Sequence, residues 1–256
     1  MPNSPFVRFS VDHGIGTVLF STPQGNSMPK HILGELAHTI EAAGHNDEVK
    51  VIVLKSTGDR VFCAGASFDE LMAIDNETDG HEFFMGFANV INAMRKCSKF
   101  IVARVQGKTV GGGVGLAASA DYCFATQFAA IKLSEITLGI GPFVVAPAIE
   151  RKIGVGATSQ VAIDATKFYD AQWAHAKGLY NELFDDMASM DEAVDDLAQK
   201  LATYSPDAMG EMKKAFWAGA DHWDELLAER AAISGRLVLS DYTKSFIQGF
   251  KNKKKG

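Results

Sequence analysis

The sequence predicts an α/β fold, with helices packed on a mostly parallel sheet, that continues into a helical C-terminal region. Strand-like runs alternate with amphipathic helical segments through the first two-thirds of the 256 residues. After Phe143 no further long strand can be recognised, and apolar residues instead recur at helical spacing. We therefore expect residues 1–187 to form the α/β core and residues 188–256 to form the helical region, with no linker between them.

The elements of the core can be assigned in chain order. Residues 6–11 and 15–21 predict a β-hairpin around the turn sequence Asp12-His13-Gly14. An amphipathic helix is expected at residues 31–44, and a buried, largely β-branched strand at residues 49–55. The remaining core elements are a helix at about residues 81–95, strands at residues 100–105 and 122–125, and a short helical stretch at residues 116–120 between these strands.

The C-terminal region contains three segments that each place apolar residues on one helical face. These positions are Ala193, Leu197 and Leu201, then Met209, Met212 and Phe216, and then Leu226, Leu227 and Ala231. Ser205 and Pro206 separate the first two segments, so we expect Ser205 to be an N-cap and Pro206 the first residue of the next helix.

The composition excludes several classes of protein. Hydrophobic residues make up 47% and charged residues 22%, which is ordinary globular usage and not that of a disordered chain. No apolar run reaches the roughly 18 to 20 residues of a membrane span, and the first residues lack the pattern of a secretory signal. A net charge of −6 argues against a nucleic-acid partner, because phosphate contacts need a basic face. We expect a cytoplasmic protein with no nucleic-acid or membrane partner.

The cysteines support the same expectation. Cys63, Cys97 and Cys123 are too few and too scattered for a disulfide framework, and no Cys-x-x-Cys pair suggests zinc. No group of His, Cys, Asp and Glu has the spacing of metal ligands. We therefore expect neither a metal site nor a redox cofactor.

Three segments have the composition of a ligand site. Residues 62–66 (Phe-Cys-Ala-Gly-Ala) follow a predicted strand, and their small side chains allow a ligand to approach the backbone N–H groups. Residues 107–116 place a glycine-rich turn before a helix, where free N–H groups and the helix dipole favour an oxyanion. Glu135, within residues 133–142, lies among apolar residues, which would raise its pKa toward the range useful for proton transfer.

Each segment also has an interpretation without a catalytic role. Residues 62–66 could form a plain tight turn, and Glu135 could be an exposed loop residue. The glycine run lacks both the Gly-Lys-Ser/Thr ending of a P-loop and the spacing of a dinucleotide-binding fingerprint. No single segment therefore assigns an activity.

Taken together, the order and spacing of these segments resemble the crotonase superfamily, the enoyl-CoA hydratase/isomerase family. The resemblance extends over roughly residues 6–251. It also includes the proline-containing turn at residues 22–27, Val105-Gln106-Gly107 before the glycine run, Asp121, and the pattern of Ala171, Ala174, Gly178 and Leu179.

This resemblance implies a ββα superhelix with a C-terminal trimerisation region, and a homotrimer or a dimer of trimers. It implies that the N–H groups of Ala64 and Gly112 form an oxyanion hole for the thioester oxygen of an acyl-CoA, and that Ala66 lies against the adenine of coenzyme A. Coenzyme A is part of the substrate, and no separate cofactor is implied. We expect the substrate-binding positions to include Gly65, Gly111, Gly115, Phe143 and Lys251.

One departure from the family pattern bears on the reaction. Family hydratases hold a water between two glutamates, whereas this chain has Gly115 at the first position and Glu135 at the second. A single carboxylate can move a proton between two carbons, so the sequence favours double-bond isomerisation over hydration. The alternatives are another crotonase reaction, such as decarboxylation or thioester hydrolysis, and a non-catalytic acyl-CoA-binding trimer.

The phosphates and the acyl group of such a substrate need partners of different kinds. Lys251 is the expected cation for coenzyme A, by resemblance to C-terminal lysines of the family, and Lys30 is a weaker candidate. Phe143 and the aromatic cluster at residues 83–87 are expected either to pack in the core or to line an apolar acyl pocket. In the second case the acyl group is compact or branched.

Overall fold

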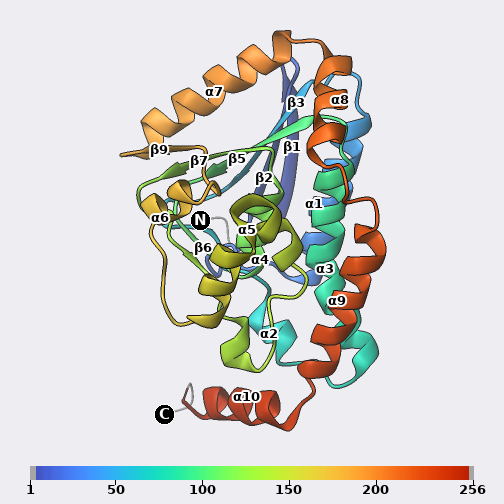
Figure 1. Cartoon of the computed structure of the whole chain (residues 1–256), viewed down its shortest axis with the longest axis vertical. Coiled ribbons are helices and arrows are strands. Elements are labelled where there is room, and N and C mark those ends of the chain that lie inside the picture. Colours follow the sequence, from blue (N-terminus) through green and yellow to red (C-terminus); the bar gives the residue numbers. More distant parts are fainter. Residues whose placement is uncertain (1–3, 254–256) are drawn as a thin grey trace.

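A six-stranded sheet organises the core, with the strand order β1-β2-β3-β5-β7-β9 (Figure 1). The structure is a computed structural model that describes residues 4–253, with side chains through residue 249. The first two strands pair antiparallel, and every later neighbour pairs parallel. These strands are β1 (Phe6–Asp12), β2 (Ile15–Ser21), β3 (Val51–Ser56), β5 (Phe100–Val105), β7 (Tyr122–Thr126) and β9 (Glu182–Phe184).

A second, three-stranded parallel sheet has the order β4-β6-β8. Its strands β4 (Val61–Cys63), β6 (Lys108–Val110) and β8 (Ile131–Lys132) each follow one strand of the large sheet. Helices come next in each case: α2 (Phe68–Leu71) with α3 (Glu77–Lys96), then α4 (Gly112–Ser119), and then the 3-10 helix η1 (Glu135–Leu138) with α5 (Ala146–Ile163). The chain thus repeats a strand–strand–helix unit, which is the predicted ββα arrangement.

The other helices complete the molecule. Helix α1 (Lys30–His45) connects the hairpin to β3, and α6 (Ala171–Ala176) precedes β9. The C-terminal region consists of α7 (Met187–Thr203), α8 (Pro206–Phe216), α9 (Trp223–Leu237) and α10 (Asp241–Lys253). Figure 1 shows α7 at one end of the molecule, where it crosses strands of the large sheet, α9 alongside α3, and α10 at the opposite end.

Two predicted boundaries have a clear local cause. His13 and Gly14 have φ values of 46° and 82°, the pair of positive values that a two-residue type I′ hairpin turn requires. The side chain of Ser205 accepts a hydrogen bond from the Ala208 N–H, and Pro206 is the first residue of α8. The predicted cap of α8 is therefore confirmed.

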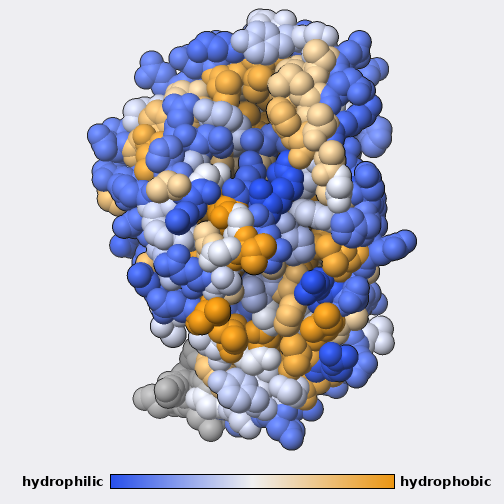
Figure 2. Space-filling model, viewed as in Figure 1, coloured by the Kyte–Doolittle hydropathy of each residue, from blue (hydrophilic) through white to orange (hydrophobic). Residues whose placement is uncertain are grey.

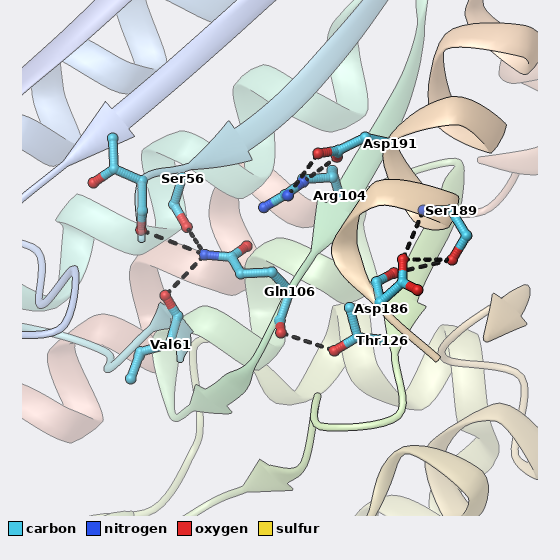
Figure 3. Close-up of polar contacts among 9 residues, drawn as sticks. Ser56, Val61, Arg104, Gln106, Thr126, Asp186, Ser189 and Asp191 are labelled. Carbon is cyan, nitrogen blue, oxygen red and sulfur yellow. Dashed lines mark hydrogen bonds and ion pairs between the residues drawn. The ribbon is translucent and has the colours of Figure 1, made fainter. Parts of the chain in front are cut away.

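The C-terminal region is packed against the core. Because side chains alternate along a strand, Val51 and Val53 of β3 face α7, whereas Ile52 and Leu54 face the main core. Arg104 of β5 also forms a bidentate ion pair with Asp191 of α7, with distances of 2.6 and 2.9 Å (Figure 3). The division of the chain at residue 187 remains a prediction.

The buried amide of Gln106 connects both sheets near the candidate site. Its Nε2 donates to Ser56 Oγ at 2.9 Å and to the Val61 carbonyl at 3.0 Å, and the backbone carbonyl of Gln106 accepts from Thr126 Oγ1 at 2.8 Å (Figure 3). These bonds join the ends of β3, β5 and β7 to the start of β4. They hold in place the two segments that were predicted to contact a ligand.

The sequence did not reveal every element. Strands β4, β6, β8 and β9 contain only two or three residues, too few to show a period of two. Helix α5 also has no counterpart among the predicted elements. Among the described residues, no helix combines the length and the hydropathy needed to cross a membrane.

Candidate active site

A cavity of about 200 Å³ lies where the second sheet, the start of α4 and η1 meet. Its walls also include side chains from α3, from the loop after η1 and from α9. Of the residues predicted from the sequence, it brings together Ala64, Gly65, Ala66, Gly111, Gly112, Glu135 and Phe143. The three segments that were separated along the chain therefore form one site.

The glycine run places backbone, and not side chains, at this site. Gly111 has a φ of 53° and is the N-cap of α4, and Gly112 is the first residue of that helix. A Cβ atom on Gly112 would lie 2.2 Å from Cζ of Phe87, so no larger residue fits without displacing that ring. As the first helical residue, Gly112 has an N–H with no acceptor inside the helix, at the positive end of the helix dipole.

The other predicted oxyanion donor needs correction. The N–H of Ala64 donates to the Gly25 carbonyl at 3.1 Å, so it is not available to a ligand. The N–H of Ala66, by contrast, has no acceptor within residues 4–253. Gly65, whose φ is 89°, brings this segment against the start of α4: its Cβ position would lie 3.6 Å from the Gly112 nitrogen. The structure thus favours Ala66, and not Ala64, as the donor beside Gly112.

Glu135 is the first residue of η1, and its carboxylate lies against the glycine run. A Cβ atom on Gly111 would be 3.0 Å from Glu135 Oε1. Glu135 Oε2 has almost no exposed surface and no hydrogen-bond partner. Burial raises the pKa of this carboxyl group to about 7, an effect that its own backbone N–H only partly opposes. Glu135 can therefore gain or lose a proton near neutral pH.

The rest of the cavity wall is mainly apolar. Phe83, Phe84 and Phe87 of α3 pack in the core and also line the cavity, and Phe143 lines it with them. The other polar side chains in the wall are Ser134 and Ser234. Within the described part of the chain, Glu135 is the one ionisable side chain that lines the cavity.

Gly115 does not reach the cavity, in contrast to its predicted role in substrate binding. It lies one turn further along the buried helix α4, and its neighbour is Val145, which does line the cavity. A Cβ atom on Gly115 would lie 2.6 Å from Val145 Cγ1 and 3.6 Å from Ile91 Cδ1. The space that a second glutamate would need is therefore filled by these aliphatic side chains.

Of the two lysines predicted to contact coenzyme A, Lys30 is the one whose side chain lies within the described residues. Lys251 lies in α10, but its side chain falls outside the described residues. Lys30 forms an ion pair with Glu82, and its backbone N–H donates to the Glu70 carboxylate at 2.8 Å. Lys30 is thus already paired in an acidic environment.

Sequence reasoning missed the C-terminal contribution to this site. Ser234 of α9 reaches the cavity wall because α9 crosses α3 in backbone contact, where a Cβ on Gly80 would be 2.8 Å from the Cα of Gly235. The sequence signal for this contact is the presence of a glycine in each helix, Gly80 and Gly235, where the two helices cross. No group of three potential metal ligands occurs in residues 4–253.

Comparison with known proteins gives a consistent assignment. Residues 10–255 match the family model described as enoyl-CoA hydratase/isomerase. The chain is 26% identical to the short-chain-enoyl-CoA hydratase of Clostridium acetobutylicum over 244 residues, which covers 94% of this chain and 92% of that protein. It is 22% identical to the peroxisomal Delta(3,5)-Delta(2,4)-dienoyl-CoA isomerase of Arabidopsis thaliana, covering 79% and 77% of the two chains.

Solved structures share the same fold. An enoyl-CoA hydratase from Bacillus halodurans superposes with a TM-score of 0.88 at 17% identity, covering 95% of this chain and 99% of that one. An enoyl-CoA hydratase/isomerase from Xanthobacter autotrophicus Py2 gives a TM-score of 0.86 at 18% identity, with 96% and 93% covered. With its ββα repeats and a match along nearly its whole length, this chain belongs to the enoyl-CoA hydratase/isomerase family of the crotonase superfamily.

Proposed function

We propose that this protein isomerises the double bond of an enoyl-CoA, moving one proton with Glu135. The observation that carries the proposal is that Glu135 is the sole ionisable side chain among the described residues of the cavity wall. Its pKa of about 7 suits a group that must accept a proton and then return it.

The reaction can be written with the chain's own groups. The Glu135 carboxylate removes a proton from C2 of a 3-enoyl thioester, and the electrons of that C–H bond move into a dienolate. The protonated carboxyl group then delivers the same proton to C4, which gives the 2-enoyl thioester and restores the carboxylate. No water enters or leaves, so one carboxylate is sufficient.

The dienolate needs stabilisation at the thioester oxygen. The free N–H groups of Ala66 and Gly112 lie in adjacent segments and are suited to donate to that oxygen. Such fixed donors act most strongly on charge that develops during the reaction, and losing one typically costs about 3 to 4 kcal/mol of barrier. In this proposal Ala66 takes the role that the sequence resemblance gave to Ala64.

The acyl group would lie against the phenylalanines of α3 and Phe143. A volume of about 200 Å³ with an apolar wall supports a compact acyl chain. The coenzyme A portion extends out of this cavity.

Hydration is the second candidate, because a relative over almost the whole chain is named a hydratase. It requires a water to be deprotonated while a proton reaches C2. Isomerisation needs only one carboxylate. Val145 and Ile91 occupy the space beside Gly115 that a second carboxylate would need.

We also infer that copies of the chain associate through the face around α8. Met212 and Phe216 of α8 are 48% and 55% exposed, and Figure 2 shows hydrophobic side chains gathered in the hollow between α7 and α8. Exposed apolar side chains gathered on one face are typical of an interface. A homotrimer or a dimer of trimers would cover them.

The reaction can be tested with purified protein and short 2-enoyl-CoA and 3-enoyl-CoA thioesters. Isomerisation converts the 3-enoyl thioester with a change in absorbance and no change in mass. A mass gain of one water from the 2-enoyl thioester, without conversion of the 3-enoyl thioester, would instead establish hydration.

A further inference from the structure

The C-terminal helix α10 packs on the turn that carries Glu135, and it does so through a hydroxyl group. Thr243 has no exposed surface, whereas Tyr242 beside it is 63% exposed. Thr243 is the one fully buried side chain of α10 among residues 241–249. Its Oγ1 lies 2.7 Å from the carbonyl oxygen of Leu138, the last residue of η1. The buried contact of α10 with the end of η1 is therefore a hydrogen bond, and the Tyr242 ring lies beside it against Gly139.

The direction of the hydrogen bonds at Thr243 follows from the number of hydroxyl protons that can be donated. A threonine hydroxyl can donate one proton. The alternative acceptor, the Leu237 carbonyl, lies at 3.2 Å, so the shorter contact with Leu138 is the stronger one. Ser240 Oγ lies 3.1 Å from Thr243 Oγ1 and can donate its own proton to it. The Thr243 hydroxyl then accepts from Ser240 and donates to η1.

The contact with Leu138 continues through the backbone to Glu135. The N–H of Ile140 donates to the Glu135 carbonyl at 3.1 Å, and the N–H of Gly139 donates to the Ile136 carbonyl at 3.0 Å. Gly139, with a φ of 80°, lets α10 approach this backbone: its Cβ position would lie 2.7 Å from Thr243 Oγ1. Glu135, the end of η1 and Thr243 thus form one hydrogen-bonded unit.

One oxygen of the carboxylate, Glu135 Oε2, has no hydrogen-bond partner, and the group acting on the carboxylate is the residue's own backbone N–H. The position of the carboxylate depends on the backbone of η1. We propose that Thr243 is a positioning residue for Glu135, whose hydroxyl fixes the Leu138 carbonyl and so keeps the carboxylate beside Gly111 in the cavity. This inference rests on the proposed function, in which Glu135 carries the proton.

Variants of Thr243 in the full chain test this role. Thr243→Val removes the hydroxyl at nearly constant size and should lower kcat for isomerisation by about 10- to 100-fold, with KM little changed, because the carboxylate is misplaced. Thr243→Ser keeps the hydroxyl and should retain near wild-type kcat. Thr158→Val is a matched control, since Thr158 is also buried, donates to the Gly154 carbonyl at 3.0 Å and does not line the cavity. It should leave kcat unchanged.

The pH profile separates positioning from a general loss of structure. In Thr243→Val the acidic limb of kcat/KM should move to lower pH, because a loosened η1 exposes the Glu135 carboxylate to water. The inference would be overturned if Thr243→Val had the wild-type kcat and an unchanged acidic limb of kcat/KM. An equal loss of kcat in Thr243→Ser would also overturn it. If Thr243→Val does not fold, Thr243→Cys replaces it as a weaker donor, and wild-type kcat in that variant is then the contradicting result.

Glu135→Gln, measured in the same assay, separates a failure of the proposed function from a failure of the role of Thr243. An active Glu135→Gln variant would overturn the proposed function itself. An inactive Glu135→Gln variant together with a fully active Thr243→Val variant would overturn only the role of Thr243.

Discussion

Burial of Glu135 has a cost in stability that depends on pH. Its pKa is about 7 in the folded protein and about 4.5 when exposed, so between these values the folded state binds more protons than the unfolded state. The stability of the fold therefore falls as pH rises from about 4.5 to about 7. A glutamine at this position avoids that loss because it does not ionise.

We accordingly expect Glu135→Gln to be more stable than the parent at pH 8 and to lose that advantage below about pH 4.5. The shift in pKa corresponds to a gain of up to about 3 kcal/mol at pH 8. Urea unfolding at pH 8 and pH 5 measures it. An equal difference at both pH values would show that Glu135 is not a buried carboxylate.

Gly115 was predicted to bind substrate, but it does not line the cavity. The resemblance places a catalytic glutamate there in hydratases, but in this structure Val145 Cγ1 lies 2.6 Å from the position of a Cβ atom. Gly115→Ala should therefore reduce the free energy of unfolding by about 1 to 3 kcal/mol through overpacking.

Truncating the neighbour should relieve this strain. The double variant Gly115→Ala/Val145→Ala should be more stable than the sum of the two single effects predicts, because both changes act in the same space. Additive effects in urea unfolding would show that Val145 is not what excludes a side chain at residue 115.

At the scale of elements, α8 shows where periodicity is insufficient. The pattern Met209, Met212, Phe216 predicted one apolar face, yet Met209 and Lys213 are the residues of α8 that are buried. Lys213 Nζ lies 2.8 Å from Asp121 Oδ2 and donates to the Lys99 carbonyl at 2.8 Å. A buried ion pair thus orients the helix and leaves Met212 and Phe216 exposed. No apolar pattern could have predicted that a lysine faces inward.

Removing one partner of this pair leaves Asp121 buried without its cation. Lys213→Met should therefore lower the free energy of unfolding by about 3 to 5 kcal/mol. Lys214→Met is the control, because its ion pair with Glu211 is exposed, and it should keep the urea midpoint of the parent. Similar midpoints for the two variants would contradict the proposed orientation of α8.

The site was predictable where it consists of contiguous motifs. Three features of the sequence suffice to identify the segments that the structure brings together at the cavity. They are the small residues after β4, the glycine run before α4 and one glutamate among apolar residues. The choice between Ala64 and Ala66 was not predictable, because it depends on a hydrogen bond from Ala64 to Gly25, which precedes it by 39 positions. Contacts from α9 and α10 likewise depend on how helices cross, which composition does not specify.

At the scale of the whole molecule, the exposed face of α8 predicts assembly. Light scattering at micromolar concentration should give the mass of a trimer or a hexamer of the 27.6 kDa chain. Met212→Glu should reduce that mass, because it places a charge in the apolar face. Ile163 of α5 is 77% exposed, and Ile163→Glu should leave the mass unchanged. A monomeric parent protein would contradict the role assigned to this face.

The α/β architecture was predictable from the long elements, because β3 and β5 are buried strands and α1 and α3 have clear apolar faces. The second sheet was not predictable, since its strands are stabilised by neighbours far apart in sequence and have no pattern of their own. It is nevertheless the second sheet that positions the loop after β4, the start of α4 and η1 around one cavity.

The most direct test of proton transfer by Glu135 is the pH dependence of kcat/KM for isomerisation of a short 3-enoyl-CoA. Because the carboxylate must be deprotonated to remove the C2 proton, kcat/KM should rise tenfold per pH unit below about pH 7 and then level off. Glu135→Gln should lower the plateau by about a hundred- to ten-thousand-fold. A flat profile between pH 5.5 and pH 8.5, or a Glu135→Gln variant with the parent's kcat/KM, would contradict this account.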